Sequence, residues 1–248
     1  MRIDPVKCTG CGQCRFFCSM RGGIMSFHRD PSSPGRVYTV INEDECVECG
    51  VCLRSGVCPT DALYQPELHW PRILRKNFSD PLKIHPETRI PGRGTEEMKT
   101  NEVTGRFRRG FYGIALELGR PGVGTRFRDV DRVSRAMASL GVTFEINNPV
   151  TRLMVDQSNG LINTEILDEK VLSAIVEFII PAHLLEAVLK EVQCVAMEID
   201  TVFSGDIIAR VEPDGQIPTV EALERLEIPV YINGKCNVGL GRPSAPEV

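Results

Sequence analysis

The chain of 248 residues contains few aromatic residues, few histidines and no long apolar run. Aromatic residues make up 6% of it, with one Trp and four Tyr. The longest apolar stretch, near 171–185, is interrupted by Glu177, Pro181 and His183 and is too short and too polar to span a bilayer. The histidines show no mutual spacing suited to a metal site. They are His28, His69, His85 and His183.

Motifs of several enzyme and targeting classes are also missing. We find no Ser-His-Asp set, no pair of catalytic carboxylates, no Walker loop and no dinucleotide-binding glycine fingerprint. The first residues, Met1-Arg2-Ile3-Asp4-Pro5, include neither a signal-peptide core nor a twin-arginine element. We therefore expect a cytoplasmic protein without a membrane insertion.

The charge is unevenly distributed along the chain. The net charge is −4, but segment 76–135 has 13 basic and 8 acidic residues, whereas segment 136–248 has 7 basic and 17 acidic residues. Since the chain is acidic overall, we expect no nucleic-acid partner. The asymmetry between segments favours docking between protein subunits.

Ten cysteines contrast with these absences, and eight of them fall in two short motifs. Residues 8–18 read CTGCGQCRFFC, and residues 46–58 read CVECGVCLRSGVC. Each motif is a C-x2-C-x2-C run followed by a fourth cysteine. Three thiolates at such spacing can reach three iron corners of one compact cluster, while the fourth ligand comes from elsewhere. The spacing predicts iron–sulfur centres.

Two other uses of these cysteines are disfavoured. Zinc is held by four thiolates in a tetrahedron, but structural zinc sites use two separated pairs, and each motif here offers three closely spaced thiols. A disulfide framework is also disfavoured, because a chain of this length can bury a core without disulfides and no secretion signal is evident. We therefore favour iron–sulfur over both alternatives.

The region 1–66 resembles the bacterial two-cluster [4Fe–4S] ferredoxins, over about a quarter of the chain. In that family the two motifs exchange their fourth ligands, and a proline follows the last ligand, as Pro59 follows Cys58 here. Three features depart from the family pattern: five residues instead of three separate Cys52 from Cys58, Ser19 instead of proline follows Cys18, and a long insertion that contains 31–35 lies between Cys14 and Cys46. The resemblance implies two [4Fe–4S] clusters, one held by Cys8, Cys11, Cys14 and Cys58 and the other by Cys46, Cys49, Cys52 and Cys18.

Within region 1–66 we expect strands at 1–3 and 36–41 and a surface excursion at 20–35. Beyond it, 67–106 is rich in proline and predicts an extended connector. Segment 213–248 predicts a helix at 219–226, a strand at 229–235 and a tail.

Segment 107–212 predicts two successive strand-helix-strand units with a hairpin at 147–167 between them. We expect Asp129 to cap the first helix and Gly141 to end it. The predicted fold is therefore α+β, with a dicluster ferredoxin domain followed by a ferredoxin-like α/β sandwich that weakly resembles the small regulatory ACT or NIL modules. The predicted strands are 110–118, 142–146, 173–180 and 202–211, and the predicted helices are 129–140 and 181–199.

Three further features could carry chemistry. The basic stretch from Arg106 to Arg135 surrounds a glycine-rich segment and could hold a phosphate or carboxylate, although we favour a solvated or docking surface. We expect Cys194, at an apolar position of a predicted helix, to lie in the core. Cys236 follows Lys235 in a predicted turn, where lysine could acidify it, but an inert thiol is favoured because no base partner is evident.

The leading hypothesis is an electron-transfer subunit without catalytic residues of its own. It would relay single electrons through two [4Fe–4S] clusters between a redox donor or acceptor protein and a catalytic subunit of a larger anaerobic oxidoreductase. The 182 residues beyond position 66 favour such a hetero-oligomer over a free ferredoxin. Two alternatives remain: a redox-linked regulatory protein whose α/β domain binds a small anionic ligand, and an enzyme that uses Cys236 or the arginine-rich loop.

Overall fold

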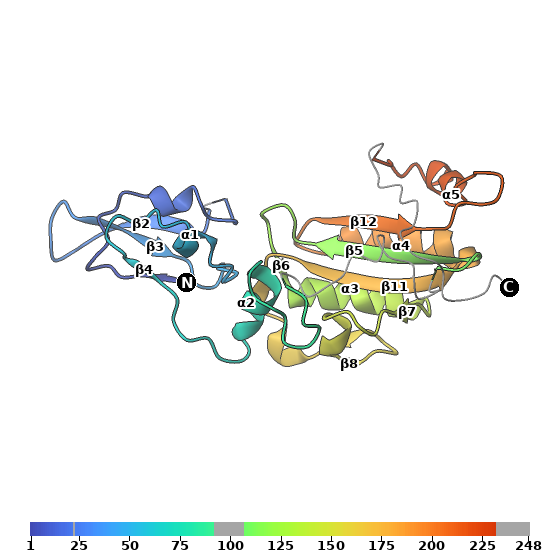
Figure 1. Cartoon of the computed structure of the whole chain (residues 1–248), viewed down its shortest axis with the longest axis horizontal. Coiled ribbons are helices and arrows are strands. Elements are labelled where there is room, and N and C mark those ends of the chain that lie inside the picture. Colours follow the sequence, from blue (N-terminus) through green and yellow to red (C-terminus); the bar gives the residue numbers. More distant parts are fainter. Residues whose placement is uncertain (22, 92–106, 232–248) are drawn as a thin grey trace.

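The computed structural model describes residues 1–21, 23–91 and 107–231, which form two units along the long axis of the molecule (Figure 1). The N-terminal unit contains both cysteine motifs, and the C-terminal unit is built on a four-stranded sheet. The prediction of mixed helix and strand structure is confirmed. In the described part of the chain, no helix is long and apolar enough to cross a membrane.

The N-terminal unit contains two small antiparallel sheets. Strand β1 (Arg2–Ile3) pairs with β4 (Leu63–Tyr64), and β2 (Met25–Arg29) pairs with β3 (Val37–Ile41). Segment 20–35 lies mostly at the surface, as predicted, but its residues 25–29 form strand β2, which was not predicted. Met25, at the start of β2, is buried although the rest of that strand is exposed, and it holds β2 against the predicted strand β3.

Each cysteine motif leads into one short helical turn. The 3-10 helix η1 (Gln13–Arg15) follows Gly12, and helix α1 (Val51–Arg54) follows Gly50. Both glycines have φ 70° and ψ 4°, a left-handed conformation that glycine adopts without the strain of a side chain. The two motifs therefore share the same local backbone geometry.

The segment between the two units contains helix α2 (Ile73–Ser79), so the prediction of an extended connector is wrong there. Leu74 and Phe78 lie four residues apart on one helix face and are buried in the core of the C-terminal unit. This burial stabilises a helical turn in a segment otherwise rich in proline. Part of the predicted connector, 92–106, lies outside the described residues.

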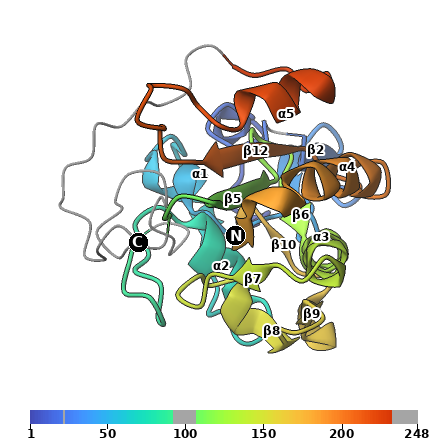
Figure 2. The same ribbon diagram turned by 90° about the vertical axis from the view of Figure 1, so that its right-hand side faces the viewer.

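A fully antiparallel sheet forms the centre of the C-terminal unit, with the strand order β12-β5-β11-β7. Helix α3 (Phe127–Ser139) follows β5, and helix α4 (Leu185–Ala196) precedes β12. The two helices lie side by side against one face of the sheet (Figure 2). The strands are β5 (Phe111–Leu118), β7 (Thr143–Phe144), β11 (Ala174–Pro181) and β12 (Phe203–Ile208).

Large apolar side chains alternate along the two central strands, β5 and β11, and the helices cover the face of the sheet from which these side chains project. Ile114 pairs with Phe178, and Leu116 pairs with Val176, and all four side chains are buried in one core. Met137 of α3 is fully buried in the same core. The smaller elements are β6 (Thr125–Arg126), β8 (Met154–Asp156), β9 (Leu161–Ile162), β10 (Lys170–Val171), η3 (Thr151–Leu153), η4 (Thr164–Ile166), η5 (Ala182–Leu184) and α5 (Val220–Arg225).

Three predictions about the helices can be compared with the structure. Asp129 does not cap α3, which begins earlier at Phe127 because that ring is fully buried. Gly141, with φ 73°, follows the end of the helix as expected. Cys194 is exposed rather than buried, because the apolar face of α4 passes through Val188 and Val195 and leaves position 194 outside it. The strand predicted at 229–235 lies mostly outside the described residues.

Candidate metal centres

The first group of thiols lies at a small cavity in the N-terminal unit. Cys8, Cys11 and Cys14 from the first motif line this cavity together with Cys58, the last cysteine of the second motif. Thr39 of β3 closes another side of it. The fold thus brings together four thiols whose positions in the sequence are as much as 50 residues apart.

Backbone amides point at two of these sulfurs. The Thr39 amide donates to Cys8 Sγ at 3.3 Å, and the Gly10 amide donates to the same sulfur at 3.5 Å. The Ala62 amide donates to Cys58 Sγ at 3.2 Å. Burial acts to raise the pKa of Cys58, but hydrogen bonds from Thr60 and Ala62 outweigh it and lower that pKa below its ordinary value. Donors of this kind stabilise thiolate charge, as a metal centre requires.

Gly10 allows the first motif to lie close to β3. It has φ +69°, and a Cβ there would lie 2.5 Å from the carbonyl oxygen of Val37. Such a contact is closer than real Cβ atoms allow, so a side chain at position 10 would force the loop away from the strand.

The second group of thiols is more enclosed. Cys46, Cys49 and Cys52 are buried, and Cys18 of the first motif is half-buried. Burial, followed by the charges of Cys49, Cys18 and Cys46, raises the pKa of Cys52 to about 12. This thiol therefore keeps its proton at neutral pH unless a bound metal displaces it.

These thiols do not form a site for a single ion. Among the residues that the structure describes, no three His, Cys, Asp or Glu side chains converge in the manner that one metal ion requires. A four-iron cluster needs a wider arrangement, because each thiolate binds a different iron. The two four-thiol groups, with amides directed at sulfur, fit that chemistry.

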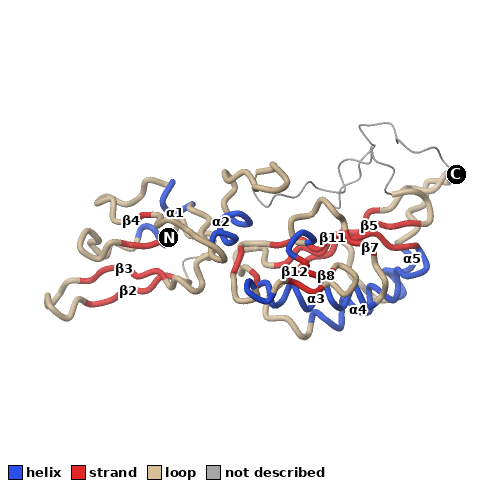
Figure 3. The backbone as a smooth tube through the Cα atoms, turned by 90° about the horizontal axis from the view of Figure 1, so that it is seen from below, coloured by secondary structure: helices blue, strands red, loops and turns tan. Residues whose placement is uncertain are grey.

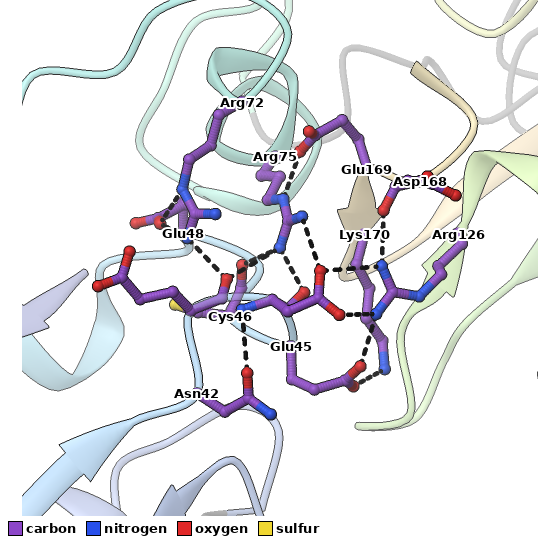
Figure 4. A network of polar contacts seen from close by, with 12 residues as sticks. Asn42, Glu45, Cys46, Glu48, Arg72, Arg75, Arg126, Asp168, Glu169 and Lys170 are labelled. Carbon is purple, nitrogen blue, oxygen red and sulfur yellow. Dashed lines mark hydrogen bonds and ion pairs between the residues drawn. The ribbon is translucent and has the colours of Figure 1, made fainter. Parts of the chain in front are cut away.

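A buried arginine holds the loop of the second motif (Figure 4). Arg75 of α2 is 3% exposed. Its guanidinium donates to the carbonyl oxygens of Asp44 at 2.6 Å and Cys46 at 3.0 Å, and it also pairs with Glu169 of the C-terminal unit. One side chain therefore links the second motif to both α2 and the C-terminal unit.

A second buried charge lies within the same loop. Glu48 is fully buried and pairs with the N-terminal amino group of Met1 and with Arg72, and it accepts a hydrogen bond from Gln65 at 3.0 Å. Burial acts to raise the pKa of Glu48, but these partners outweigh it and hold the pKa below its ordinary value. The carboxylate therefore remains ionised and fixes the loop between Cys46 and Cys49.

The basic stretch identified in the sequence contributes to the contact between the units. Arg126 pairs with Asp44 at 2.7 Å and with Glu45 at 2.6 Å, and Lys170 pairs with Glu45 at 2.5 Å (Figure 4). Arg128 pairs with Asp168. Other arginines of the stretch also have carboxylate partners, whereas Arg106 lies outside the described residues. These pairs are Arg120 with Glu117, Arg132 with Asp129, and Arg135 with Asp131.

The remaining candidates do not join either thiol group. Cys194 lies alone on an exposed helix face, and Cys236 lies outside the described residues. Arg72 and Arg75 were not predicted as functional residues. Their spacing of three residues, together with the acidic run that starts at Glu43, was the available signal for an ion-pair network.

Comparisons with known proteins find a family match in the N-terminal unit. Residues 7–62 match the model of the 4Fe-4S dicluster domain. The chain is 37% identical over 71 residues to a protein described as "Ferredoxin-like protein in vnf region" from Azotobacter chroococcum mcd 1, over 27% of this chain and 92% of that protein. No solved structure matches the chain significantly.

Proposed function

Because the chain belongs, through residues 7–62, to the family of 4Fe–4S dicluster ferredoxins and carries two [4Fe–4S] clusters, we propose that it is an electron-transfer subunit of a larger oxidoreductase complex. Each bound cluster supplies a centre that accepts and releases one electron at a time. The chain's own residues bind the irons, direct amide hydrogen bonds at sulfur and keep water from the second group.

The proposed ligands follow the two thiol groups. Cys8, Cys11, Cys14 and Cys58 would hold the first cluster, and their common cavity supports this assignment. For the second cluster, the buried position of Cys52 next to Cys18, Cys46 and Cys49 supports the exchange of fourth ligands between motifs. The eight proposed ligands are Cys8, Cys11, Cys14, Cys18, Cys46, Cys49, Cys52 and Cys58.

We also infer a ferredoxin-like sandwich for the C-terminal unit. In chain order its strands β5, β7, β11 and β12 are first to fourth, so the sheet order is 4-1-3-2. Helix α3 lies between the first and second strands and α4 between the third and fourth, as in the split βαβ arrangement. Such a unit supplies surface for a partner subunit, beyond what two clusters need.

The observation that carries the subunit role is the fixed contact between the two units. Ion pairs from Arg75, Arg126 and Lys170 hold the second motif against the C-terminal unit. A regulatory protein that binds an anion at 120–135 has less support, because Arg120, Arg128 and Arg132 already have carboxylate partners.

Anaerobic purification of the native assembly with an antibody to this chain tests the proposal. Iron analysis should give about eight irons per chain. Electron paramagnetic resonance should detect two reduced [4Fe–4S] centres, and mass spectrometry should find a catalytic subunit in a fixed ratio. A chain that carries all its iron but purifies alone would contradict the subunit role and leave electron transfer in place.

A further inference from the structure

The two thiol groups differ in exposure, and this difference defines an open side of the N-terminal unit. Cys11 is exposed, whereas every cysteine of the second motif before Cys58 is buried. The second motif also lies against the C-terminal unit, where Val47 packs in a small cluster with Leu172. A protein that exchanges electrons with this chain therefore comes closest to a cluster at the first group.

Exposed aromatic side chains lie beside this first motif. Phe27 of β2 is 47% exposed, and its ring lies so close to Gly12 that a Cβ there would be 2.7 Å from it. The Arg15 guanidinium lies over the same ring, 5.2 Å from its centre. Phe16, the next residue, is 88% exposed. Aromatic and arginine side chains of this kind are enriched in protein interfaces.

The charge around these rings is positive. Arg29 lies two residues after Phe27, on the same side of β2. Neither Arg15 nor Arg29 forms an ion pair with a carboxylate in the described ranges, and Asp30 pairs with Arg36 instead, at 3.2 Å. The hairpin of β2 and β3 points away from the C-terminal unit (Figures 1 and 3). We name Arg15, Phe16, Phe27 and Arg29 the cluster-1 face.

We propose that the cluster-1 face docks an electron-transfer protein whose one-electron centre lies beneath an acidic surface with an apolar middle. Phe16 and Phe27 give the apolar contact, and the two arginines attract carboxylates at the rim and increase the rate of encounter. One electron passes between the cluster and the partner's centre, with no bond made and no proton moved. The inference rests on the proposed function and adds the site and the chemistry of the partner.

The test uses the full chain with its clusters and two charge-matched double variants. Arg15→Glu with Arg29→Glu reverses the cluster-1 face. Arg152→Glu with Lys190→Glu makes the same change in net charge at exposed positions of the C-terminal unit. Each protein is reduced with dithionite and mixed in a stopped-flow instrument with ferric rubredoxin, an acidic one-iron acceptor, or with ferric cytochrome c, a basic one. The second-order rate is measured over a range of salt concentration.

With rubredoxin, the wild-type rate should fall as salt rises, because salt screens the attraction. Reversal of the cluster-1 face should lower the rate at low salt about tenfold and invert its salt dependence, while the control variant changes it less than about twofold. With cytochrome c the cluster-1 variant should instead react faster than the wild type.

Equal effects of the two double variants, or no effect of either, would overturn the docking face. Iron content and the resonance spectrum of each protein keep this result separate from the proposed function. Absence of the two four-iron centres from the wild type would contradict electron transfer itself. Intact centres with unchanged rates would contradict only the docking face.

Discussion

Arg75 shows how one side chain connects the second motif with both neighbouring elements. Its donors satisfy the carbonyl oxygens of Asp44 and Cys46, which lie in the loop after β3, and its charge meets Glu169. A buried guanidinium is stable only when such partners surround it. The side chain therefore depends on the position of the loop as much as the loop depends on it.

Replacement of Arg75 by Gln should destabilise the chain by about 3–5 kcal/mol, because it leaves Glu169 and the loop carbonyls without their partner. The free energy of unfolding is measured by urea titration of the cluster-loaded protein under anaerobic conditions. Arg128→Gln serves as the control. That residue pairs with Asp168 at the exposed surface, so its loss should change the free energy by less than about 1 kcal/mol. Equal losses in the two variants would contradict this role of Arg75.

Gly10 in the first motif and Gly35 in the turn between β2 and β3 allow steric contact to be separated from backbone strain. Gly10→Ala should displace the loop, because its Cβ would lie 2.5 Å from the Val37 carbonyl oxygen, and the protein should retain about four irons instead of eight. Gly35 has φ +90°, but a Cβ there would meet no other part of the chain within 4 Å, so Gly35→Ala adds only backbone strain. Iron analysis after anaerobic purification compares the two. Full iron in the Gly10 variant would exclude the steric explanation.

At the scale of elements, periodicity predicted the regular structure well where one face of an element is buried. The alternation in β5 and β11 and the apolar face of α4 follow directly from their sequences. Strand β2 was missed because only its first residue, Met25, is buried, so one face of it is not marked by apolar residues. Helix α2 was missed because its stability comes from partners far away in the sequence. Phe78 packs edge-on against Phe127 of α3 at 5.4 Å, and no local pattern indicates that contact.

His85 lies after α2 and gives this part of the fold a dependence on pH. It is 4% exposed, its ring packs edge-on against Phe78 at 5.3 Å, and burial lowers the pKa of its imidazole. As pH falls below the ordinary value of 6.5, the unfolded chain takes up a proton that the folded chain resists. The stability contributed by neutral His85 is therefore present above pH 6.5 and is lost as pH falls further.

The variant His85→Phe should remove this loss. Between about pH 7.5 and 5.5 the wild type should lose on the order of 1 kcal/mol more unfolding free energy than the variant. Urea titrations at several pH values measure the difference. His183→Phe, at an exposed position, is the control and should keep the wild-type pH dependence. Parallel pH profiles for wild type and His85→Phe would disprove the assignment.

At the scale of the whole molecule, the sequence identified the centres but not their surroundings. Eight cysteines at characteristic spacing predicted two clusters, and the family match confirms the cofactor. The sequence did not predict that Arg126 and Lys170 would pair with Asp44 and Glu45, because 81 or more residues separate the partners. Only the fold brings these charges together.

Charge reversal at this contact should separate the two units. Arg126→Glu places a third carboxylate beside Asp44 and Glu45, and their repulsion should open the contact that covers the second motif. Small-angle X-ray scattering should then give a larger radius of gyration, and exposure to air should bleach the second cluster faster. Arg128→Glu, two residues away, should leave both measurements near the wild-type values. A compact Arg126 variant with unchanged air sensitivity would show that the pairs do not close the contact.

The order of the two units along the chain has a consequence for biogenesis. At about 5–20 residues per second, a ribosome needs roughly 10–40 s to complete the 182 residues that follow position 66. Until Leu172 and its neighbours have been synthesised, the surface that later covers Val47 and Cys49 does not exist. Iron–sulfur carriers can therefore reach the second site in the nascent chain. In the folded protein the C-terminal unit covers that site. A chain released without that cluster would have to open its arginine contacts before it could be repaired.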